Sequence, residues 1–579
     1  MTLERVLFLL FLVLVAGLAV AIWWIRDRKK RGKIRATHGL SEFQEMAGPE
    51  VVARRNAQLD RSRPWTLWGR LVDAENGEIT NVGVVTDDHS AIDVYGGPGS
   101  GKTAGTLIPA VLRHPGAALV STTKSDLAKS TIRARAQVGP VHVFDPGADA
   151  VHTPSLAPYQ AVWTPITEGA SWRRAELCAR GLLGGLDSAS DQKNSFFHFQ
   201  AGNLLAILLI LLHATPGSTM EGFTERLKAL NPSRKPDETE DAGEAVSQAW
   251  DALEKELETE KKKAEVAADA GDTDGWERYQ TYVQALAAYP ATRDAARAAE
   301  TRAGIMGSLG QVAAAWVSSY ATYAQPWDKD NTLDPQALAD DDTATLYLIC
   351  PDAAVRPLTN ALLGAYVEAL ARRAMREGGS LPAQRLIVLD ELVHCTPHSD
   401  LCSWMANLAR SARIKFIISS QCFADLQDAY GDHKARSIHN ACSGGHLLLG
   451  GGSDLETFKL FTEQAGKRQL WIKTTEAVTT GSNSNTESGH IFAGSTGESG
   501  STTVTEGWVE RDVANAARLS AMPVFHGLAI LKGTVGSTGL PVQIQLLPWF
   551  QDDDLRAAAR GDADALRAIR QPPLPPRRR

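Results

Sequence analysis

The chain has few cysteines, no strong excess of either charge, and a single apolar run long enough to cross a membrane. None of its six cysteines forms a C-x-x-C pair or stands with histidines at zinc-site spacing, so we expect reduced, mostly buried thiols. The 60 basic residues against 67 acidic residues give a net charge of −7, which excludes a uniformly basic nucleic-acid coat protein. A hydrophobic content of 44% across 579 residues excludes a disordered or collagen-like chain.

The apolar run occupies residues 6–25, VLFLLFLVLVAGLAVAIWWI. As a helix it covers roughly the 30 Å of a bilayer core, and lysines and arginines at 26–35, opposed only by Asp27, predict that the carboxyl side is cytoplasmic. The alternative is a cleaved signal peptide with its site near residues 19–21, but the run is long for one. The next apolar run, 204–212, is too short to span. We therefore expect a single-pass protein of the cell (inner) membrane with most of the chain in the cytoplasm.

A complete phosphate-binding motif, G-x-x-x-x-G-K-[ST], follows a predicted strand at 91–95 and precedes a predicted helix at 103–112. Glycines let the backbone curl around phosphates with its N–H groups pointing inward. Lys102 is expected to reach the β and γ phosphates of ATP, and the Thr103 hydroxyl to ligate Mg²⁺. The predicted nucleotide-binding residues are Gly96, Gly97, Pro98, Gly99, Ser100, Gly101, Lys102 and Thr103.

Two further strand ends carry candidate catalytic residues. The apolar run 385–389 delivers Asp390 and Glu391 at its carboxyl end, where ligands bind in open α/β sheets. Asp390 is the candidate for the Mg²⁺ shell, and Glu391 the candidate for polarising the attacking water. Gln421 ends the run 416–421 and is the candidate sensor of the γ-phosphate.

Short apolar runs that alternate with helical stretches predict a doubly wound α/β sheet. Residues between 144 and 345 lack a convincing strand and predict an all-helical insert. The other predicted strands are 118–121, 141–144, 345–349, 386–389, 416–419 and 446–449. The expected parts are an anchor with a basic juxtamembrane segment (1–35), the first part of the nucleotide-binding domain (36–165), the helical insert (166–340), the second part (341–550, with a flexible Gly/Ser/Thr loop or long hairpin at 479–507) and a carboxyl-terminal tail (551–579).

Together these motifs resemble the coupling proteins of type IV secretion systems, the TraG/TraD-like conjugative ATPases. The resemblance also rests on five segments: LIPAVLRHPGAALVSTTKSDL (107–127), VFDPG (143–147), LYLICPD (346–352), the Gln421 segment continuing to Tyr430-Gly431, and DLETFKLFTEQAGKR (454–468). It implies a RecA-like P-loop NTPase with an inserted all-α domain and an N-terminal transmembrane helix. It also implies a homohexamer that hydrolyses ATP with Mg²⁺ and moves DNA, often with an attached relaxase, into a secretion channel of the inner membrane.

In this family an arginine about ten residues before the sensor glutamine is a candidate finger for a neighbouring subunit's nucleotide. Arg410 occupies that place here, and Arg413 is the nearby alternative. Many relatives have two membrane helices where this chain offers one. Many also carry an acidic residue shortly before the lysine of the second strand. This chain has Ser121-Thr122-Thr123 before Lys124 instead, so Lys124 is given no catalytic role.

Two other functions fit parts of the pattern. An FtsK-type translocase of double-stranded DNA shares the anchor, the P-loop and the hexamer, but the chain after Pro548 is too short for its DNA-reading winged helix. A non-hydrolysing ATP-binding membrane scaffold has no need of Glu391, because a binder does not polarise water.

Overall fold

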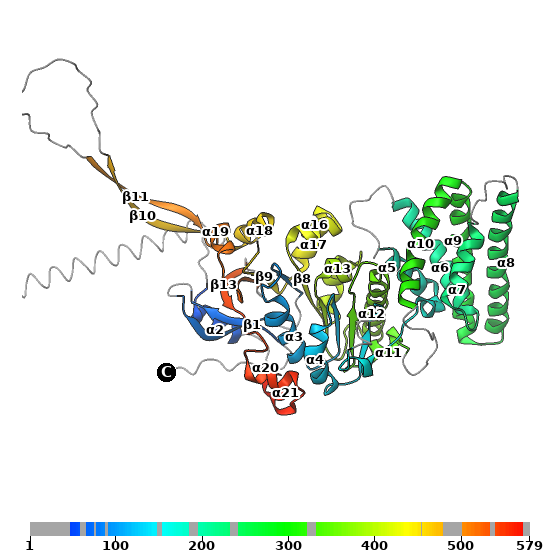
Figure 1. Cartoon of the computed structure of the whole chain (residues 1–579), viewed down its shortest axis with the longest axis horizontal. Helices are drawn as coiled ribbons and strands as arrows, with labels where there is room; N and C mark the ends of the chain where they lie inside the picture. The colour runs from blue at the N-terminus through cyan, green and yellow to red at the C-terminus, as the bar shows by residue number, and fades with distance from the viewer. Residues whose placement is uncertain are drawn as a thin grey trace, which may run out of the picture.

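An eleven-stranded mixed sheet forms the body of the protein (Figure 1). The structure is a computed structural model that describes residues 47–57, 65–73, 77–86, 91–147, 153–184, 195–231, 241–320, 332–452, 454–478, 501–532 and 539–570. The predicted membrane span at 6–25 and the Pro/Arg end of the chain lie outside these residues. The strands of the sheet are β1 (Thr66–Val72), β2 (Ile79–Thr86), β3 (Ile92–Tyr95), β4 (Ala118–Thr122), β5 (Val141–Phe144), β6 (Thr345–Ile349), β7 (Arg385–Leu389), β8 (Ile414–Ser420), β9 (Gly445–Leu449), β12 (His526–Leu531) and β13 (Leu540–Gln545).

The sheet has a parallel part and an antiparallel part. The order is β2-β1-β13-β12-β9-β3-β8-β7-β4-β6-β5, and the strands from β9 to β5 are mutually parallel. These are the strands that the apolar runs predict, so this prediction is confirmed. The antiparallel strands β12, β13, β1 and β2 continue the sheet beyond β9 and were not predicted.

Helices cover both faces of the parallel part, which is why its strands are apolar along their whole length. In β6, Leu346 and Leu348 belong to the hydrophobic core that includes α12, whereas Tyr347 and Ile349 belong to the core on the other face, with α3 and α4. The helices that pack on or beside the sheet are α2 (Pro49–Ala57), η1 (Lys102–Leu107), α3 (Ile108–Arg113), α4 (Asp126–Ala136), η2 (Ala157–Tyr159), α12 (Arg356–Arg376), α13 (Leu392–Cys395), α14 (Leu401–Ser403), η5 (Trp404–Leu408), α15 (Ala409–Ser411), α16 (Phe423–Tyr430), α17 (Asp432–Ala441), α18 (Leu455–Ala465), α19 (Ala516–Ser520), α20 (Asp553–Ala559) and α21 (Ala563–Arg570).

A block of helices stands at one end of the molecule, between β5 and β6 in the chain (Figure 1). Its members are η3 (Pro165–Ala170), α5 (Trp172–Gly184), α6 (Ser195–Ala214), α7 (Met220–Leu230), α8 (Asp241–Asp269), α9 (Thr273–Ala296), α10 (Ala299–Tyr320) and α11 (Pro335–Asp340). The chain leaves and rejoins the sheet body at one place, because Val162 and Thr332 form a parallel bridge and the Leu333 amide donates to the Val162 carbonyl at 2.7 Å. The domain boundaries themselves stay predictions.

Helix α6 shows why an apolar run alone does not identify a membrane span. Within the described ranges, Phe196–Ala214 is the one helix long and apolar enough to cross a membrane by length and composition. The run 204–212, expected to be too short, lies inside this longer helix. However, 67% of the apolar window is buried, because α5, α9, α10 and η3 surround it. We therefore assign α6 to the core of the helical block.

Of two carboxyl-terminal segments, one agrees with a stated alternative and one differs from the expectation. β10 (Lys467–Val478) and β11 (Ser501–Asp512) form a long antiparallel hairpin that projects from the body (Figure 1), so residues 501–507 of the expected loop or hairpin are strand. Residues 479–500 lie outside the described part. Within the expected tail, α20 and α21 bury Leu555, Leu566 and Ile569 against the sheet's helices, so the packed body extends to Arg570.

Candidate nucleotide-binding site

The glycine-rich loop joins β3 to η1 and needs glycine for two separate reasons. Gly99 and Gly101 have φ angles of 76° and 96°, in the left-handed region that side chains disfavour. A Cβ atom on Gly101 would also lie 2.5 Å from the Phe525 ring, and one on Gly97 would lie 2.9 Å from the Gly451 carbonyl oxygen. Close approach of other backbone and ring atoms therefore shapes the loop as much as its own dihedral angles do.

Asp390 lies at the base of the loop, directly after β7. Its Oδ2 accepts a hydrogen bond from the Thr103 hydroxyl at 3.1 Å, and its Oδ1 accepts one from the Ser419 hydroxyl at 2.7 Å. The side chain is buried, with 5% of the residue exposed. Thr103 and Asp390, the two predicted Mg²⁺ ligands, therefore lie together although they are 287 positions apart.

Glu391 takes a backbone conformation that is uncommon for a side-chain-bearing residue. Its φ is 49°, and its amide donates to the Ser419 hydroxyl at 3.1 Å. Its carboxylate accepts a hydrogen bond from the Thr123 hydroxyl at 2.7 Å. Strain of this kind persists only where the surroundings hold it, and it is frequent at functional sites. Here two neighbouring strand ends fix both the backbone and the carboxylate of Glu391.

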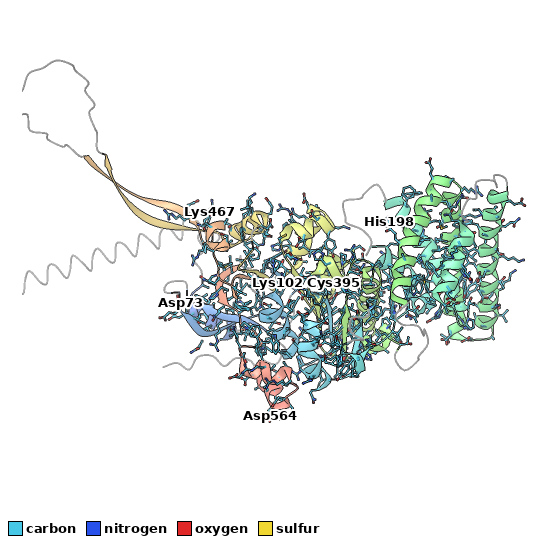
Figure 2. All side chains as sticks on the ribbon, in the orientation of Figure 1. Asp73, Lys102, His198, Cys395, Lys467 and Asp564 are labelled. Carbon is cyan, nitrogen blue, oxygen red and sulfur yellow. The ribbon has the colours of Figure 1, made fainter. Side chains whose placement is uncertain are left out.

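A cavity of about 320 Å³ lies over the loop and both acids. Lys102 is at its floor, with only 6% of the residue exposed, and its Nζ donates to the Gly96 carbonyl. Figure 2 places Lys102 in the sheet body, well separated from His198 on the helical block. The residues lining the cavity are Gly97, Pro98, Gly99, Ser100, Gly101, Lys102, Thr103, Ala104, Thr122, Thr123, Lys124, Asp126, Leu127, Asp390, Glu391 and Phe525.

Burial dominates the electrostatics of the cavity floor. It lowers the pKa of Lys102, although Asp390 and Glu391 oppose this by stabilising the ammonium. Burial raises the pKa of Asp390, and the neighbouring Glu391 adds to the rise, whereas the hydrogen bonds from Ser419 and Thr103 and the charge of Lys102 oppose it. The cavity lining holds two cations, Lys102 and Lys124, and three carboxylates, Asp126, Asp390 and Glu391, so it has an excess of negative charge that a divalent cation would balance.

The donor set fits magnesium. The Thr103 hydroxyl and the Asp390 carboxylate are oxygen ligands of the kind that Mg²⁺ prefers, and they already lie at hydrogen-bond distance from each other. The Ser100 hydroxyl in the loop is buried and has no hydrogen-bond partner among the described atoms, as expected for a group that meets a polar ligand.

The remaining predicted residues lie apart from the cavity. Gln421 follows β8 at the same sheet edge, where its amide donates to Asp425 at 3.2 Å, but it is not among the described cavity-lining residues. Arg410 lies in α15 and Arg413 directly precedes β8, so both are at the opposite end of the parallel strands, roughly 20 Å away by the length of β8. Neither α15 nor the start of β8 therefore lies at the cavity end of the parallel strands.

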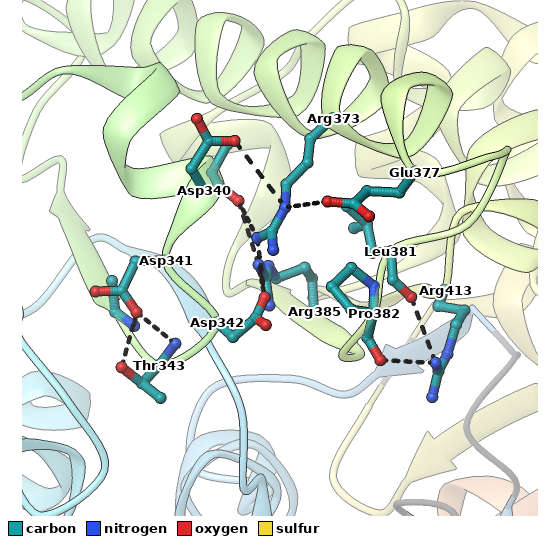
Figure 3. Close-up of polar contacts among 12 residues, drawn as sticks. Asp340, Asp341, Asp342, Thr343, Arg373, Glu377, Leu381, Pro382, Arg385 and Arg413 are labelled. Carbon is teal, nitrogen blue, oxygen red and sulfur yellow. Dashed lines mark hydrogen bonds and ion pairs between the residues drawn. The ribbon is translucent and has the colours of Figure 1, made fainter.

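The Arg413 side chain is held by hydrogen bonds to backbone carbonyls of the same chain (Figure 3). Its guanidinium donates to the carbonyls of Leu381 and Pro382, at 3.3 and 2.9 Å. In the same region the buried Arg385 pairs with Asp342 at 2.5 Å, and Arg373 donates to the same carboxylate oxygen at 2.8 Å. These contacts connect the start of β7 to the segment before β6.

Sequence reasoning missed the two hydroxyl residues that hold the acids, Thr123 and Ser419, and the ring of Phe525. A signal for the first two exists, because both follow or end predicted strands that neighbour β7. Phe525 offers no such signal, since it precedes β12, a strand of the antiparallel part that the apolar runs do not reveal.

A buried polar cluster lies within β3 beneath the loop. Asp93 accepts hydrogen bonds from Nδ1 of His439 and of His446, both at 2.6 Å, and from the Tyr95 hydroxyl at 3.2 Å. Burial by itself raises the pKa of Asp93, but the two imidazoles lower it more, and the net shift is downward. Burial lowers the pKa of His446 to about 4. The cluster links β3 to α17 and β9.

Taken together, strand, glycine loop, helix and an acid-bearing neighbour strand in a parallel sheet define a RecA-like P-loop nucleotide-binding fold. The sequence profile of the family described as Type IV secretory system Conjugative DNA transfer matches residues 41–492. The chain belongs to this family of conjugative coupling proteins. No curated protein sequence matches the chain.

Several solved structures share the fold. The bacterial conjugative coupling protein TrwBΔN70, in its unbound monoclinic form, has a TM-score of 0.54 at 12% identity and covers 88% of this chain and 96% of its own. TrwB in complex with the non-hydrolysable GTP analogue GDPNP has a TM-score of 0.52 at 12% identity, with 88% and 95% covered. TrwB in complex with ADP and Mg²⁺ has a TM-score of 0.51 at 12% identity, with 88% and 97% covered.

Proposed function

We propose that this protein is a membrane-anchored ATPase that couples ATP hydrolysis to the transfer of DNA into a type IV secretion channel. The observation that carries the proposal is the pair of acids at the glycine loop. Asp390 bonds the loop's own Thr103 hydroxyl, and Glu391 lines the same cavity with its carboxylate oriented by Thr123. A protein that only binds ATP has no use for a second, separately held carboxylate.

The residues have distinct roles in this proposal. The backbone N–H groups from Gly97 to Thr103 would surround the phosphates, and Lys102 would exchange its bond to the Gly96 carbonyl for phosphate oxygens. Thr103 and Asp390 would hold Mg²⁺, which supplies charge neutralisation at the β and γ phosphates. Glu391 would polarise the attacking water. The solved structures of TrwB with a non-hydrolysable ATP analogue and with ADP and Mg²⁺ support ATP and Mg²⁺ as the ligands of this site.

We assign the trans-acting arginine to Arg410. A finger that acts on a neighbouring subunit must lie away from its own nucleotide, and Arg410 lies at the far end of β8. Arg413 is the weaker candidate because its guanidinium already donates to two backbone carbonyls. This assignment requires a ring of subunits, for which a homohexamer is our proposal, and Gln421 would report the γ-phosphate from the same sheet edge.

The proposed surroundings follow from the family and the sequence. Residues 6–25 would anchor the chain once in the inner membrane, with the bulk of it in the cytoplasm. The partners would be DNA, with any relaxase attached to it, and the inner-membrane components of the channel. Family membership in conjugative DNA transfer supports this part of the proposal.

The test is ATP turnover by the full-length protein in detergent, with and without DNA. Wild type should hydrolyse ATP faster with DNA present. Glu391→Gln keeps the shape of the side chain but removes the base, so it should bind ATP and lose at least about a hundredfold in kcat. Lys102→Ala should lose binding as well.

A matched control and a contrary result make this test decisive. Glu368→Gln changes an acid on α12 that pairs with the exposed Arg173, and it should leave turnover unchanged. Full ATPase activity of Glu391→Gln, or wild-type protein that binds ATP without turnover in the presence of DNA, would contradict the proposal.

A further inference from the structure

The buried polar cluster beneath the glycine loop brings together three side chains of the types that bind metal ions. Asp93 is the second residue of β3, His439 lies in the last turn of α17, and His446 is the second residue of β9. None of the three is more than 1% exposed. Within the part of the chain that the structure describes, they form the one group of three or more such residues whose ligand atoms all lie within 4.8 Å of one another.

Both imidazoles point the same ring nitrogen at one carboxylate. Nδ1 of His439 lies 2.6 Å from Oδ2 of Asp93, and Nδ1 of His446 lies 2.6 Å from Oδ1. The two rings are stacked, with centroids 3.8 Å apart and planes inclined by 21°. The Tyr95 hydroxyl lies 3.2 Å from Oδ2 of Asp93 and 3.3 Å from Nδ1 of His439. Two ring nitrogens, a carboxylate and a hydroxyl therefore face one small volume.

The rings around this cluster are apolar. The Phe461 ring stands edge-to-face with His439 at 6.5 Å and with His446 at 6.4 Å, and the Phe423 ring stands edge-to-face with His439 at 5.9 Å. A carboxylate in such surroundings is costly to bury, and proteins offset the cost by pairing it or by letting it coordinate a metal ion.

Hydrogen bonds alone leave polar atoms of this region unsatisfied. Nε2 of His446 is buried without a partner among the described atoms, and so is Oε1 of Gln464. A buried polar atom without a partner costs about 1–3 kcal/mol. The side-chain nitrogen of Gln464 lies 2.7 Å from Nε2 of His439, and turning this amide over would place Oε1 there. Oε1 would then accept the N–H of His439, which is the outer contact that a metal-bound imidazole usually makes.

We propose that Asp93, His439 and His446 bind a structural zinc ion, with the Tyr95 hydroxyl as the fourth ligand. Imidazole nitrogen and carboxylate oxygen are donors that zinc accepts in tetrahedral sites. The ion takes the place of the two Nδ1 hydrogens, and each neutral imidazole then carries its proton on Nε2. Full burial of the three residues gives no access to a substrate, so the role is structural.

Loading requires a small movement and joins three elements. Tetrahedral zinc with bonds near 2.0 Å separates its donor atoms by about 3.3 Å, so the two 2.6 Å contacts of Asp93 would widen by well under about 1 Å. The ion would connect β3, the strand that leads into the glycine loop, to α17 and β9. This site is separate from the proposed Mg²⁺ site at Thr103 and Asp390 and does not depend on ATP hydrolysis.

The experiment measures the zinc content of the full-length protein in detergent by plasma mass spectrometry. The protein is purified without chelator or nucleotide from cells grown with added zinc. Wild type should hold about one zinc per chain. His446→Asn and Asp93→Asn should each hold at least about tenfold less, because each removes one ligand of the ion. His433→Asn changes an exposed histidine on the same helix, α17, and should hold as much zinc as wild type.

Two further measurements do not depend on the folding of the ligand variants. Removing zinc from wild type with a chelator should lower its melting temperature, and adding zinc back should restore it. Tyr95→Phe removes only the hydroxyl and keeps the ring that packs edge-to-face on Phe423 and Phe461, so it should fold normally. In a competition titration with a chelator it should bind zinc about tenfold more weakly than wild type.

Three outcomes would overturn the proposal. Wild type that holds no stoichiometric zinc, and whose melting temperature does not respond to added zinc, shows that hydrogen bonds alone hold the cluster. Wild-type zinc content in both His446→Asn and Asp93→Asn shows that the ion is bound elsewhere. Unchanged zinc affinity of Tyr95→Phe removes the hydroxyl from the ligand set and so contradicts the four-ligand site.

Discussion

Thr123 provides the sharpest test of how the catalytic acid is held. Thr123→Val replaces a hydroxyl with a methyl group of similar size and removes the 2.7 Å hydrogen bond to the Glu391 carboxylate. A hydrogen bond to a charged group contributes about 1.5–3 kcal/mol. If the bond orients Glu391 in the transition state, its loss should lower kcat by about ten- to one-hundredfold. KM should change little, since the phosphate contacts lie on the loop.

The assay is steady-state ATP turnover with DNA present, over a range of ATP concentrations. Thr123→Ser restores a hydroxyl and should recover most of the lost kcat. Thr259→Val removes a hydroxyl that bonds only the Lys255 carbonyl on the exposed helix α8, and it should have no effect. A kcat for Thr123→Val within twofold of wild type would refute the reasoning, as would a loss confined to KM.

Three further predictions concern the loop, an ion pair and pH. Gly101→Ala places a Cβ against Phe525 at a φ of 96°, so it should abolish nucleotide binding in a calorimetric titration. Asp342→Ala leaves the buried Arg385 without its carboxylate and should lower the free energy of unfolding by about 2–3 kcal/mol in a urea titration. The folded-state pKa of His446, about 4, lies below the unfolded value near 6.5, so the unfolded chain binds the extra proton between these values. Stability should therefore fall as pH falls through this window, by about 2 kcal/mol between pH 7.5 and 5.

Matched variants separate these effects from general damage. Gly99→Ala has a φ of 76° but no atom within 4 Å of the new Cβ, so it should weaken nucleotide binding less than the change at Gly101. Asp340→Ala breaks a pair with the exposed Arg376 and a longer contact with Arg373 at 4.0 Å, and should cost less than about 1 kcal/mol. In metal-free protein, His446→Asn should make the free energy of unfolding less dependent on pH between 7.5 and 5. An unchanged dependence would show that other groups cause it.

The parallel half of the fold could be predicted because its strands are buried on both faces. Such strands read as continuous apolar runs, and β4, β6, β7 and β9 are buried at every position. The antiparallel half gives a weaker signal. β1 and β2 contain glycine, polar residues and exposed positions, and they join the sheet only through β13, more than four hundred positions away. Nothing local in the sequence reports that pairing.

The site, like the fold, has one part that the sequence predicts and another part that it does not. The glycine loop and the two acids are predictable because phosphate binding demands a fixed spacing and because parallel strands end at one edge. Thr123 and Ser419 are ordinary hydroxyl residues until the sheet order places them on either side of β7. Phe525 is harder still to predict, since its ring meets Phe550 only after β12 and β13 have paired.

The bridge between Val162 and Thr332 gives the helical block a two-stranded stalk. The block is also held to the sheet body by helix packing, because the Asn360 side-chain amide on α12 donates to the Gly181 carbonyl of α5 at 2.7 Å and Arg173 of α5 pairs with Glu368 of α12. The helical block and the sheet body are therefore joined both by this pair of chain connections and by a packed pair of helices, so a substitution in the contact between α5 and α12 acts on both parts at once.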